Sequence, residues 1–98
     1  MEFKTTILFA ALQDLDDAVN WYNEIQPELG KDLVLKFQQA LIEIEEKPLL
    51  SQKLNQGFRK VNLKRFPYKL VFKIEEKEII IIAVAHHKRK SGYWKKRK

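Results

Sequence analysis

The amino-acid sequence predicts an α+β domain in which an N-terminal strand and an antiparallel helical hairpin pack on an antiparallel β-sheet meander. Apolar residues recur at spacings of three and four in the first half of the chain, as in amphipathic helices, and mostly alternate with polar ones in the second half, as in strands. Only short links separate these runs. A chain of 98 residues, 45% of them hydrophobic, has room for one core, so we expect a single domain over residues 1–98.

The first half is predicted to hold one strand and two helices. Residues 3–9 are rich in β-branched and aromatic side chains, which favours a strand. Residues 11–25 follow with the spacing of a helix, and their apolar stripe is Leu12, Leu15, Ala18, Val19, Tyr22 and Ile25. A second stripe runs over residues 29–44 and stops before Pro48, while Pro27 suits the first turn of this helix. The short link between the helices predicts an antiparallel hairpin.

No set of side chains has the spacing of a metal site. Asp14, Asp16 and Asp17 lie near the start of the first helix, where negative charge is favourable beside the positive end of the helix dipole. We interpret them in this way rather than as ligands. His86 and His87 are adjacent, so in an extended segment they point to opposite sides and make a poor ligand pair. We therefore predict no metal and no cofactor.

The second half is predicted to form three strands, over residues 58–65, 68–75 and 78–86. The links between them, Phe66-Pro67 and Glu76-Lys77, are short enough for antiparallel hairpins. Residues 49–57, which precede these strands, are predicted to be an irregular polar connection. Residues 87–98 form a tail that is mostly charged.

Strand alternation predicts an open sheet face lined by lysines, because alternate side chains of a strand point to opposite faces. In the second meander strand the side chains that cover the helices are Tyr68, Leu70, Phe72 and Ile74. The side chains on the opposite, open face of the first two meander strands are Lys60, Asn62, Lys64, Lys69, Val71 and Lys73.

The third meander strand is apolar on both faces, which predicts a central strand that is covered on both sides. One face would hold Ile79, Ile81, Ala83 and Ala85. The other face would hold Ile80, Ile82, Val84 and His86. The first strand, the C-terminal tail or a bound partner could cover this second face. A partner is the sharper hypothesis, because exposed apolar patches of this size usually mark binding sites.

The net charge of +6 is unevenly divided along the chain. Residues 1–56 hold five basic and ten acidic residues, a net charge of −5, whereas residues 57–98 hold fourteen basic and three acidic residues, a net charge of +11. This division indicates a polyanionic or acidic partner for the second half. In the tail, basic residues flank Tyr93 and Trp94, a combination that can pair with phosphates and stack on bases. The alternatives are a solvated basic face and a Trp94 that anchors the tail to the core.

Several classes of function are excluded. A chain without cysteine has no disulfide and no thiolate nucleophile, which suits a reducing cytoplasm. No apolar run approaches the roughly 20 residues of a membrane helix, and no secretory signal is evident, so we expect a soluble cytoplasmic protein. Glycine-rich nucleotide-binding motifs and the nucleophile elbow are absent. Any catalysis would be metal-free RNA cleavage, in which cations stabilise the charged transition state and a His or Tyr moves protons.

One ordered series of residues runs along nearly the whole chain. Its members are Ala11, Asp14-Leu15, Ala18, Trp21-Tyr22, Leu29-Gly30, Phe37, Leu41, Ile44, Pro48, Arg59, Leu63, Phe66-Pro67-Tyr68, Phe72, Ala83-Val84, His86, Arg89 and Tyr93-Trp94. In order and spacing this series resembles the RelE/ParE superfamily of toxins from bacterial type II toxin–antitoxin systems. The resemblance implies the same helical hairpin and meander that the periodicity predicts.

The resemblance implies two alternative activities, of which the first is RNA cleavage. RelE-like members are described as cutting messenger RNA on the ribosome with basic residues on the open sheet face and a C-terminal Tyr or His. Lys60 and Lys69 match two of the basic positions, whereas Asn62 stands where a lysine is expected. His87 or Lys88 stands where an arginine is expected. The nuclease set implied for this chain is Lys60, Lys69, His86 or His87, Arg89 and Tyr93.

ParE-like members are instead described as poisons of DNA gyrase that do not need this basic set, and the series above resembles this branch more closely. The leading hypothesis is therefore a ParE-like growth inhibitor with a gyrase-type target. A cognate antitoxin would neutralise it by covering the groove and the open face with an acidic or apolar segment. The alternatives are the RelE-like ribosome-dependent endoribonuclease and an inactive relative that only binds RNA or protein. The residues expected to bind the target or the antitoxin are Lys60, Lys64, Lys69, Lys73, Arg89, Tyr93 and Trp94.

Overall fold

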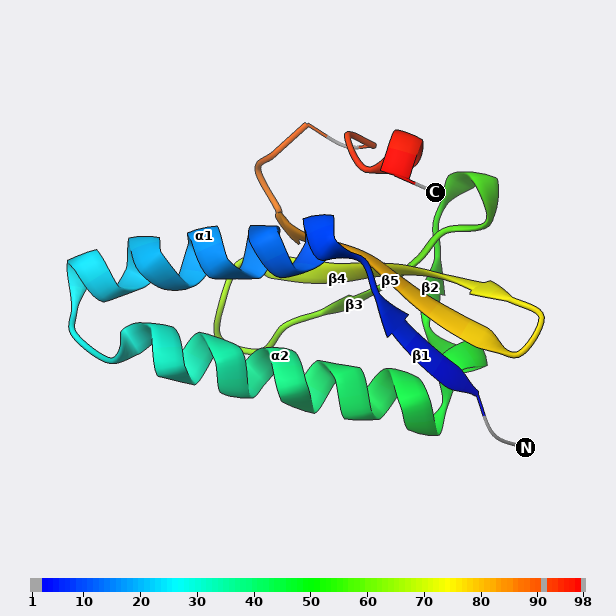
Figure 1. The fold of residues 1–98 in the computed structure, drawn as a ribbon, viewed down its shortest axis with the longest axis horizontal. Helices are drawn as coiled ribbons and strands as arrows, with labels where there is room; N and C mark the ends of the chain where they lie inside the picture. The colour runs from blue at the N-terminus through cyan, green and yellow to red at the C-terminus, as the bar shows by residue number, and fades with distance from the viewer. Residues whose placement is uncertain (1–2, 91, 98) are drawn as a thin grey trace.

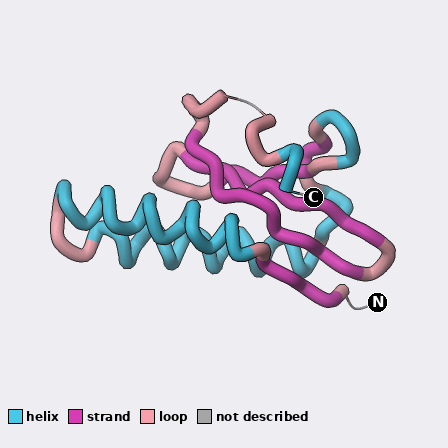
Figure 2. Tube along the Cα trace, turned by 45° about the horizontal axis from the view of Figure 1, so that its top comes forward, coloured by secondary structure: helices cyan, strands magenta, loops and turns pink. Residues whose placement is uncertain are grey.

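Two helices lie side by side against one face of a five-stranded sheet, and the C-terminal segment packs on the other face (Figure 1, Figure 2). The computed structural model describes residues 3–90 and 92–97. This arrangement confirms the predicted α+β class. In chain order the elements are β1 (Lys4–Ile7), α1 (Phe9–Ile25), α2 (Leu29–Glu46), η1 (Pro48–Leu50), β2 (Gln52–Lys53), η2 (Asn55–Gly57), β3 (Arg59–Asn62), β4 (Tyr68–Glu75), β5 (Glu78–His86) and η3 (Lys95–Arg97).

The helices α1 and α2 form the predicted hairpin, with differences at their ends. Phe9 is the first residue of α1 rather than part of the preceding strand, and it is 79% exposed. Pro27 lies in the turn between the helices and not in α2, because Glu28 adopts a left-handed conformation (φ 71°) that interrupts the helical path. Gly30 lets the helices approach, since a Cβ there would lie 2.7 Å from Val19 Cγ1. Within residues 3–90 and 92–97, no helix has the length and apolar character needed to cross a membrane.

The sheet is mixed, with the strand order β1-β5-β4-β3-β2. β4 and β5 occupy the predicted ranges, and the antiparallel pairs β3–β4 and β4–β5 confirm the meander. β1 pairs with β5 in parallel, so it extends the edge of the sheet instead of covering a face of β5. The connection predicted to be irregular contains β2, which pairs with β3. β3 ends at Asn62, three residues earlier than predicted, and the turn that follows holds Arg65 at φ 72°.

A β-bulge in β5 changes which of its side chains face the helices. The register shifts between Val71 and Phe72 of β4, whose partners in β5 are Ala83 and Ile81, so Ile82 is the extra residue. The helix side of β5 holds Ile79, Ile81 and Val84. The other side holds Ile80, Ile82, Ala83 and Ala85. The prediction of strict alternation is therefore wrong after the bulge, which reverses the expected faces of Ala83, Val84, Ala85 and His86.

Each face of the sheet has its own hydrophobic core. Leu33 and Phe37 of α2 pack with Leu70 and Phe72 of β4 in the core between helices and sheet. On the opposite face, which we call the tail face, Trp94 is only 3% exposed. The buried residues of this second core are Phe58, Val71, Ile80, Ile82, Ala83, Ala85 and Trp94. The chain's own tail thus covers the second face of β5, which corrects the hypothesis that a partner covers it.

Candidate functional site

Asp14 and Arg97 tie the C-terminal segment to the edge of β5. Pairing of β1 with β5 stops at Ile81, so the next backbone groups of β5 need other partners. Asp14 Oδ2 accepts hydrogen bonds from the Val84 N–H (3.0 Å) and from Arg97 Nη1 (2.7 Å). Arg97 Nη1 also donates to the carbonyl of Ile82 (3.0 Å). This ion pair, with side chains 11% and 22% exposed, therefore closes the strand edge and holds the tail.

The structure corrects the interpretation of the three aspartates of α1. Because α1 begins at Phe9, Asp14, Asp16 and Asp17 lie beyond its first turn, where the helix dipole has little effect. Asp14 is instead the ion-pair partner of Arg97. Among the described residues, no group of three or more His, Asp or Glu side chains is arranged to hold a metal ion.

Tyr93 lies close to two guanidinium groups. Arg89 Cζ is 3.8 Å and Arg97 Cζ is 5.1 Å from the centroid of its ring. The hydroxyl group donates a hydrogen bond to Asp14 Oδ2 (3.4 Å). Burial, followed by the charge of Asp14, raises the pKa of Tyr93 despite the opposing effect of the two arginines. Tyr93 therefore keeps its proton at neutral pH and helps to hold the tail.

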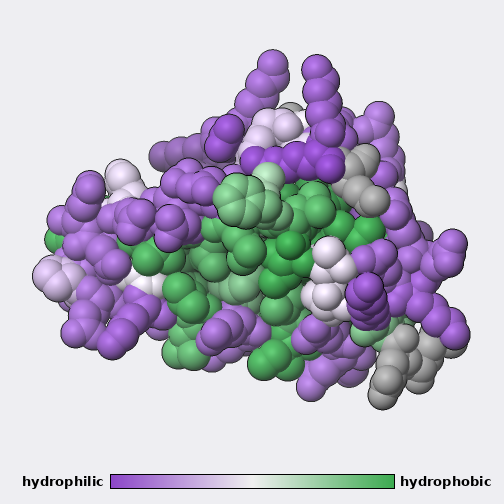
Figure 3. Space-filling model, viewed as in Figure 1, coloured by the Kyte–Doolittle hydropathy of each residue, from purple (hydrophilic) through white to green (hydrophobic). Residues whose placement is uncertain are grey.

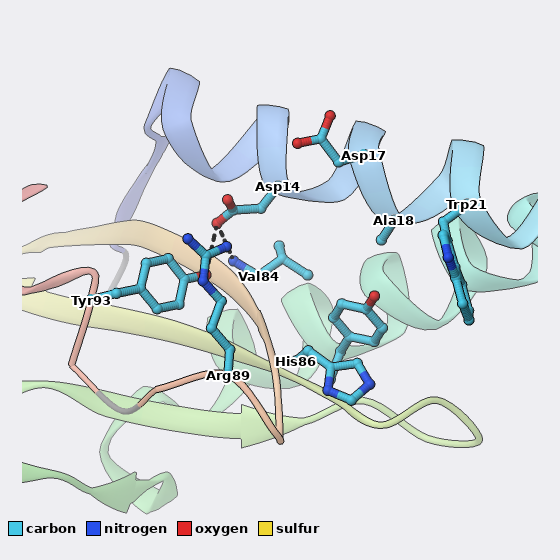
Figure 4. Close-up of a pocket in the computed structure, with 9 residues that line it drawn as sticks. Asp14, Asp17, Ala18, Trp21, Val84, His86, Arg89 and Tyr93 are labelled. Atoms are coloured by element: carbon cyan, nitrogen blue, oxygen red, sulfur yellow. Dashed lines mark hydrogen bonds between the residues drawn. The ribbon is translucent and has the colours of Figure 1, made fainter.

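A pocket of about 170 Å³ lies between α1 and the end of β5 (Figure 4). The His86 ring packs against the ring of Tyr68, with 5.0 Å between centroids, and so lies on the side of α1. Arg89 and Tyr93 lie at one end of the pocket and Trp21 lies at the other (Figure 4). Three members of the expected nuclease set thus meet here. The lining residues are Asp14, Asp17, Ala18, Trp21, Tyr68, Val84, His86, Arg89 and Tyr93.

Lys60 and Lys69 lie on the tail face, close to His87. Lys69 is the cross-strand neighbour of Asn62, whose Oδ1 accepts a hydrogen bond from Lys60 Nζ (3.4 Å). Burial, followed by the charge of Lys60, lowers the pKa of Lys69. Burial, followed by the charges of Lys69, Lys60 and His86, lowers the pKa of His87. His87, and not His86, is therefore the histidine beside the two lysines.

The other predicted binding residues are divided between two sides of the sheet. Lys69 Nζ lies 5.2 Å from the centroid of the Trp94 ring, and Lys73 Nζ lies 4.6 Å from that of Phe58. Trp94 is buried beneath the Lys69 side chain, so it anchors the tail to the sheet. Lys64 does not join the tail face as predicted, because β3 has already ended, and it lines a pocket beside α2 instead.

The outer surface of the two helices carries apolar side chains that the sequence pattern did not identify as a site. Phe9, Leu12, Leu35 and Ile42, which we call the helix surface, are between 44% and 79% exposed. Figure 3 shows apolar side chains gathered over α1 and α2 on this side of the molecule. Leu12, which its spacing assigned to the apolar stripe of the first helix, is part of this exposed surface. The seven-residue spacing of Leu35 and Ile42, which places both on one face of a helix, is the signal that could have found them.

Solved structures share this fold, and three of them illustrate it. A chain of the chromosomal ParDE TA system from P. aeruginosa is 20% identical, with a TM-score of 0.78 over 87% of this chain and 96% of that chain. A chain of the intact E. coli RelBE toxin–antitoxin complex is 23% identical, with a TM-score of 0.65 over 89% and 99%. The YoeB dimer from Staphylococcus aureus gives 19% identity and a TM-score of 0.61 over 89% and 99%. No curated protein matches this chain.

One protein family matches the sequence along most of the fold. The model of the ParE toxin of type II toxin–antitoxin system, parDE, matches residues 8–91, from the start of α1 to beyond the end of β5. The match includes both helices, the meander and the two histidines, and it agrees with the resemblance that the ordered residues indicate. The chain therefore belongs to the ParE toxin family of type II toxin–antitoxin systems.

Proposed function

We propose that this toxin inhibits growth by binding a target of the gyrase type and that it does not cleave RNA. The observation that supports this proposal is the division of the nuclease set. Lys60 and Lys69 lie on the tail face, whereas His86, Arg89 and Tyr93 line the pocket beside α1. Metal-free cleavage needs the cations and the proton-transferring groups around one phosphate.

The contacts of Tyr93 support the same proposal. Its hydroxyl group is hydrogen-bonded to Asp14, and Asp14 is in turn paired with Arg97. A tyrosine that accepts or donates a proton at a scissile phosphate needs a free hydroxyl group. Here the group is occupied in holding the tail.

We also propose that a cognate antitoxin binds the helix surface. The exposed side chains of Phe9, Leu12, Leu35 and Ile42 form an apolar area of the kind that usually marks a protein interface. An amphipathic helix of the antitoxin can bury this area with its own apolar face. The ParDE and RelBE structures that share the fold are toxin–antitoxin assemblies by name, which supports a partner of this class.

A second candidate function is the RelE-like endoribonuclease, and one observation favours it. His87 lies within electrostatic reach of Lys69 and Lys60, and its lowered pKa keeps it neutral near pH 7. A neutral histidine beside two cations has the chemistry needed to accept a proton while a phosphate is held. This set lacks the tyrosine, because Tyr93 faces Asp14.

The two candidates are separated by expressing the toxin without antitoxin, followed by primer extension on cellular messages and a supercoiling assay with purified gyrase. We expect growth arrest, inhibition of supercoiling by purified gyrase, and no codon-phased cuts in primer extension on cellular messages. Codon-phased cuts with intact supercoiling would contradict the gyrase-type target and support the endoribonuclease. Normal growth at a verified level of folded toxin would instead support an inactive relative that only binds a partner.

A further inference from the structure

The ion pairs identified among the described residues do not involve the lysines of the tail face. The ion pairs found in this part of the chain all use acidic side chains from the helical half, namely Asp14, Glu28 and Asp32. None of the lysines of the tail face takes part in one. These lysines come from β2, β3, β4 and η3, and they are Lys53, Lys60, Lys69, Lys73 and Lys95.

The apolar floor beneath these lysines is already covered. Val71, Ile80 and Ile82 are at most 2% exposed, and Trp94 fills the space above them. The ammonium groups of Lys69 and Lys73 lie over the rings of Trp94 and Phe58. The tail face therefore presents charge and little apolar area. Protein interfaces need an apolar centre, whereas a phosphate backbone is bound mainly by cations.

We propose that the tail face, with Lys60 and Lys69 at its centre, binds the phosphodiester backbone of duplex DNA. Duplex DNA fits better than a single strand, because single-stranded nucleic acids are bound by stacking their bases on free aromatic rings. Phe58 and Trp94 of this face are buried and lie under lysines, and the partly buried ring of Tyr93, which packs against the same core, is covered by Arg89. The proposal rests on the proposed function for its cellular role, since a gyrase-type target holds DNA.

His87 offers an internal probe of this surface. The positive charges of Lys69 and Lys60, together with burial and His86, lower its pKa. A phosphate group bound near Lys69 offsets those charges, so DNA binding raises the pKa of His87. The Lys69→Gln substitution also raises this pKa without DNA, because it removes the largest charge effect.

The first experiment measures binding of the whole purified chain to a labelled duplex of mixed sequence over a series of salt concentrations. The double variant K60Q/K69Q is compared with K31Q/K47Q, which removes the same charge from the helical half. Each lost phosphate contact reduces the magnitude of the slope of log K against log salt by about 0.9. We therefore expect this magnitude to fall by about 1.8 in K60Q/K69Q and to stay unchanged in K31Q/K47Q. Equal slopes in wild type and K60Q/K69Q would overturn the proposal.

The second experiment follows the His87 ring proton by NMR during pH titrations with and without the duplex. We expect a higher His87 pKa with DNA, and an unchanged value would overturn the proposal. A single-stranded RNA or a poly-glutamate peptide of equal charge that binds more tightly than the duplex would also overturn it. Supercoiling assays run in parallel separate the two proposals. DNA binding without gyrase inhibition would contradict only the proposed gyrase-type target. Gyrase inhibition without DNA binding would contradict only the proposal that the tail face binds DNA.

Discussion

The helix surface and the tail face of this toxin differ in how their apolar residues meet solvent. On the helix surface Phe9 and Ile42 are more than half exposed, and the helices carry Asp14 and Asp32, which form ion pairs with basic side chains. On the tail face Phe58 and Trp94 are buried, and the ammonium groups of Lys73 and Lys69 lie over their rings. A chain of this size thus leaves one apolar surface open and closes the other with its own C-terminal residues.

This difference separates two kinds of recognition. Open apolar area stabilises a complex when a partner covers it, and a protein helix provides such cover. A closed floor with cations above it gains little from apolar contact but gains from counterion release when a polyanion binds. The net charges agree with this difference, since the half of the chain that contains the helices is negative and the half that contributes most of the tail face is positive.

The largest effect is expected when the tail face is opened. Trp94→Ala removes a buried side chain and leaves the floor around Ile82 uncovered, so the free energy of unfolding should fall by about 3–5 kcal/mol. Urea unfolding of the variant and of the wild type measures this change in the free energy of unfolding. The matched control is Trp21→Ala on α1, which removes an exposed ring and should cost less than about 1 kcal/mol. Similar losses in the two variants would show that the tail does not cover this face.

A smaller loss is expected when the tail is untied from the strand edge. Asp14→Ala removes the acceptor of Arg97 and of the Val84 N–H, which should cost about 2–3 kcal/mol. Asp14→Asn keeps an acceptor oxygen and should cost less. Asp17→Ala, on the same helix, is the control and should stay within about 0.5 kcal/mol. A double-mutant cycle of Asp14 with Arg97 measures the coupling, and zero coupling would contradict the role of the ion pair.

The third prediction tests the helix surface. Leu35→Ser and Ile42→Ser should each weaken antitoxin binding by about tenfold or more, because residues at the centre of an interface contribute more than about 1 kcal/mol. The stability of the free toxin should change little, since both side chains are exposed. Isothermal titration calorimetry with the cognate antitoxin measures the affinity. Lys31→Ser, on the same helix, is the control. Unchanged affinity in both Leu35→Ser and Ile42→Ser would show that the antitoxin binds another surface of the toxin.

The smallest effect is a pH dependence that belongs to the tail face. Because the pKa of His87 is lower in the folded chain, the unfolded state binds more protons between the two pKa values. The free energy of unfolding therefore rises with pH through this window and falls as the pH decreases. Urea midpoints between about pH 5 and 7 measure the slope. Lys69→Gln should flatten it and His87→Gln should remove this contribution, whereas a steeper slope in either variant would contradict the assignment.

Much of the fold could be predicted because its signals are local. The alternation in residues 68–75 and the continuous apolar run in residues 78–86 marked the two long strands, and the three-and-four spacing marked both helices. The site was predicted only in part. Lys60, Lys69 and Lys73 share a face as expected, since β4 alternates without interruption. Lys64 was misplaced because β3 ends early in a turn, and no periodicity marks that end.

The sequence by itself determined the helix and strand periods, the charge of each half and the family, because all three depend only on the order of residues along the chain. Only the tertiary structure decided which histidine joins the lysines. One extra residue at Ile82 turns His86 toward α1, and its neighbour His87 lies near Lys69. Only the tertiary structure brought Asp14 to Arg97 across 83 positions of the chain. Both arrangements depend on contacts between distant parts of the chain, the register of β5 against β4 and the packing of the tail on the sheet, which form only in the folded protein.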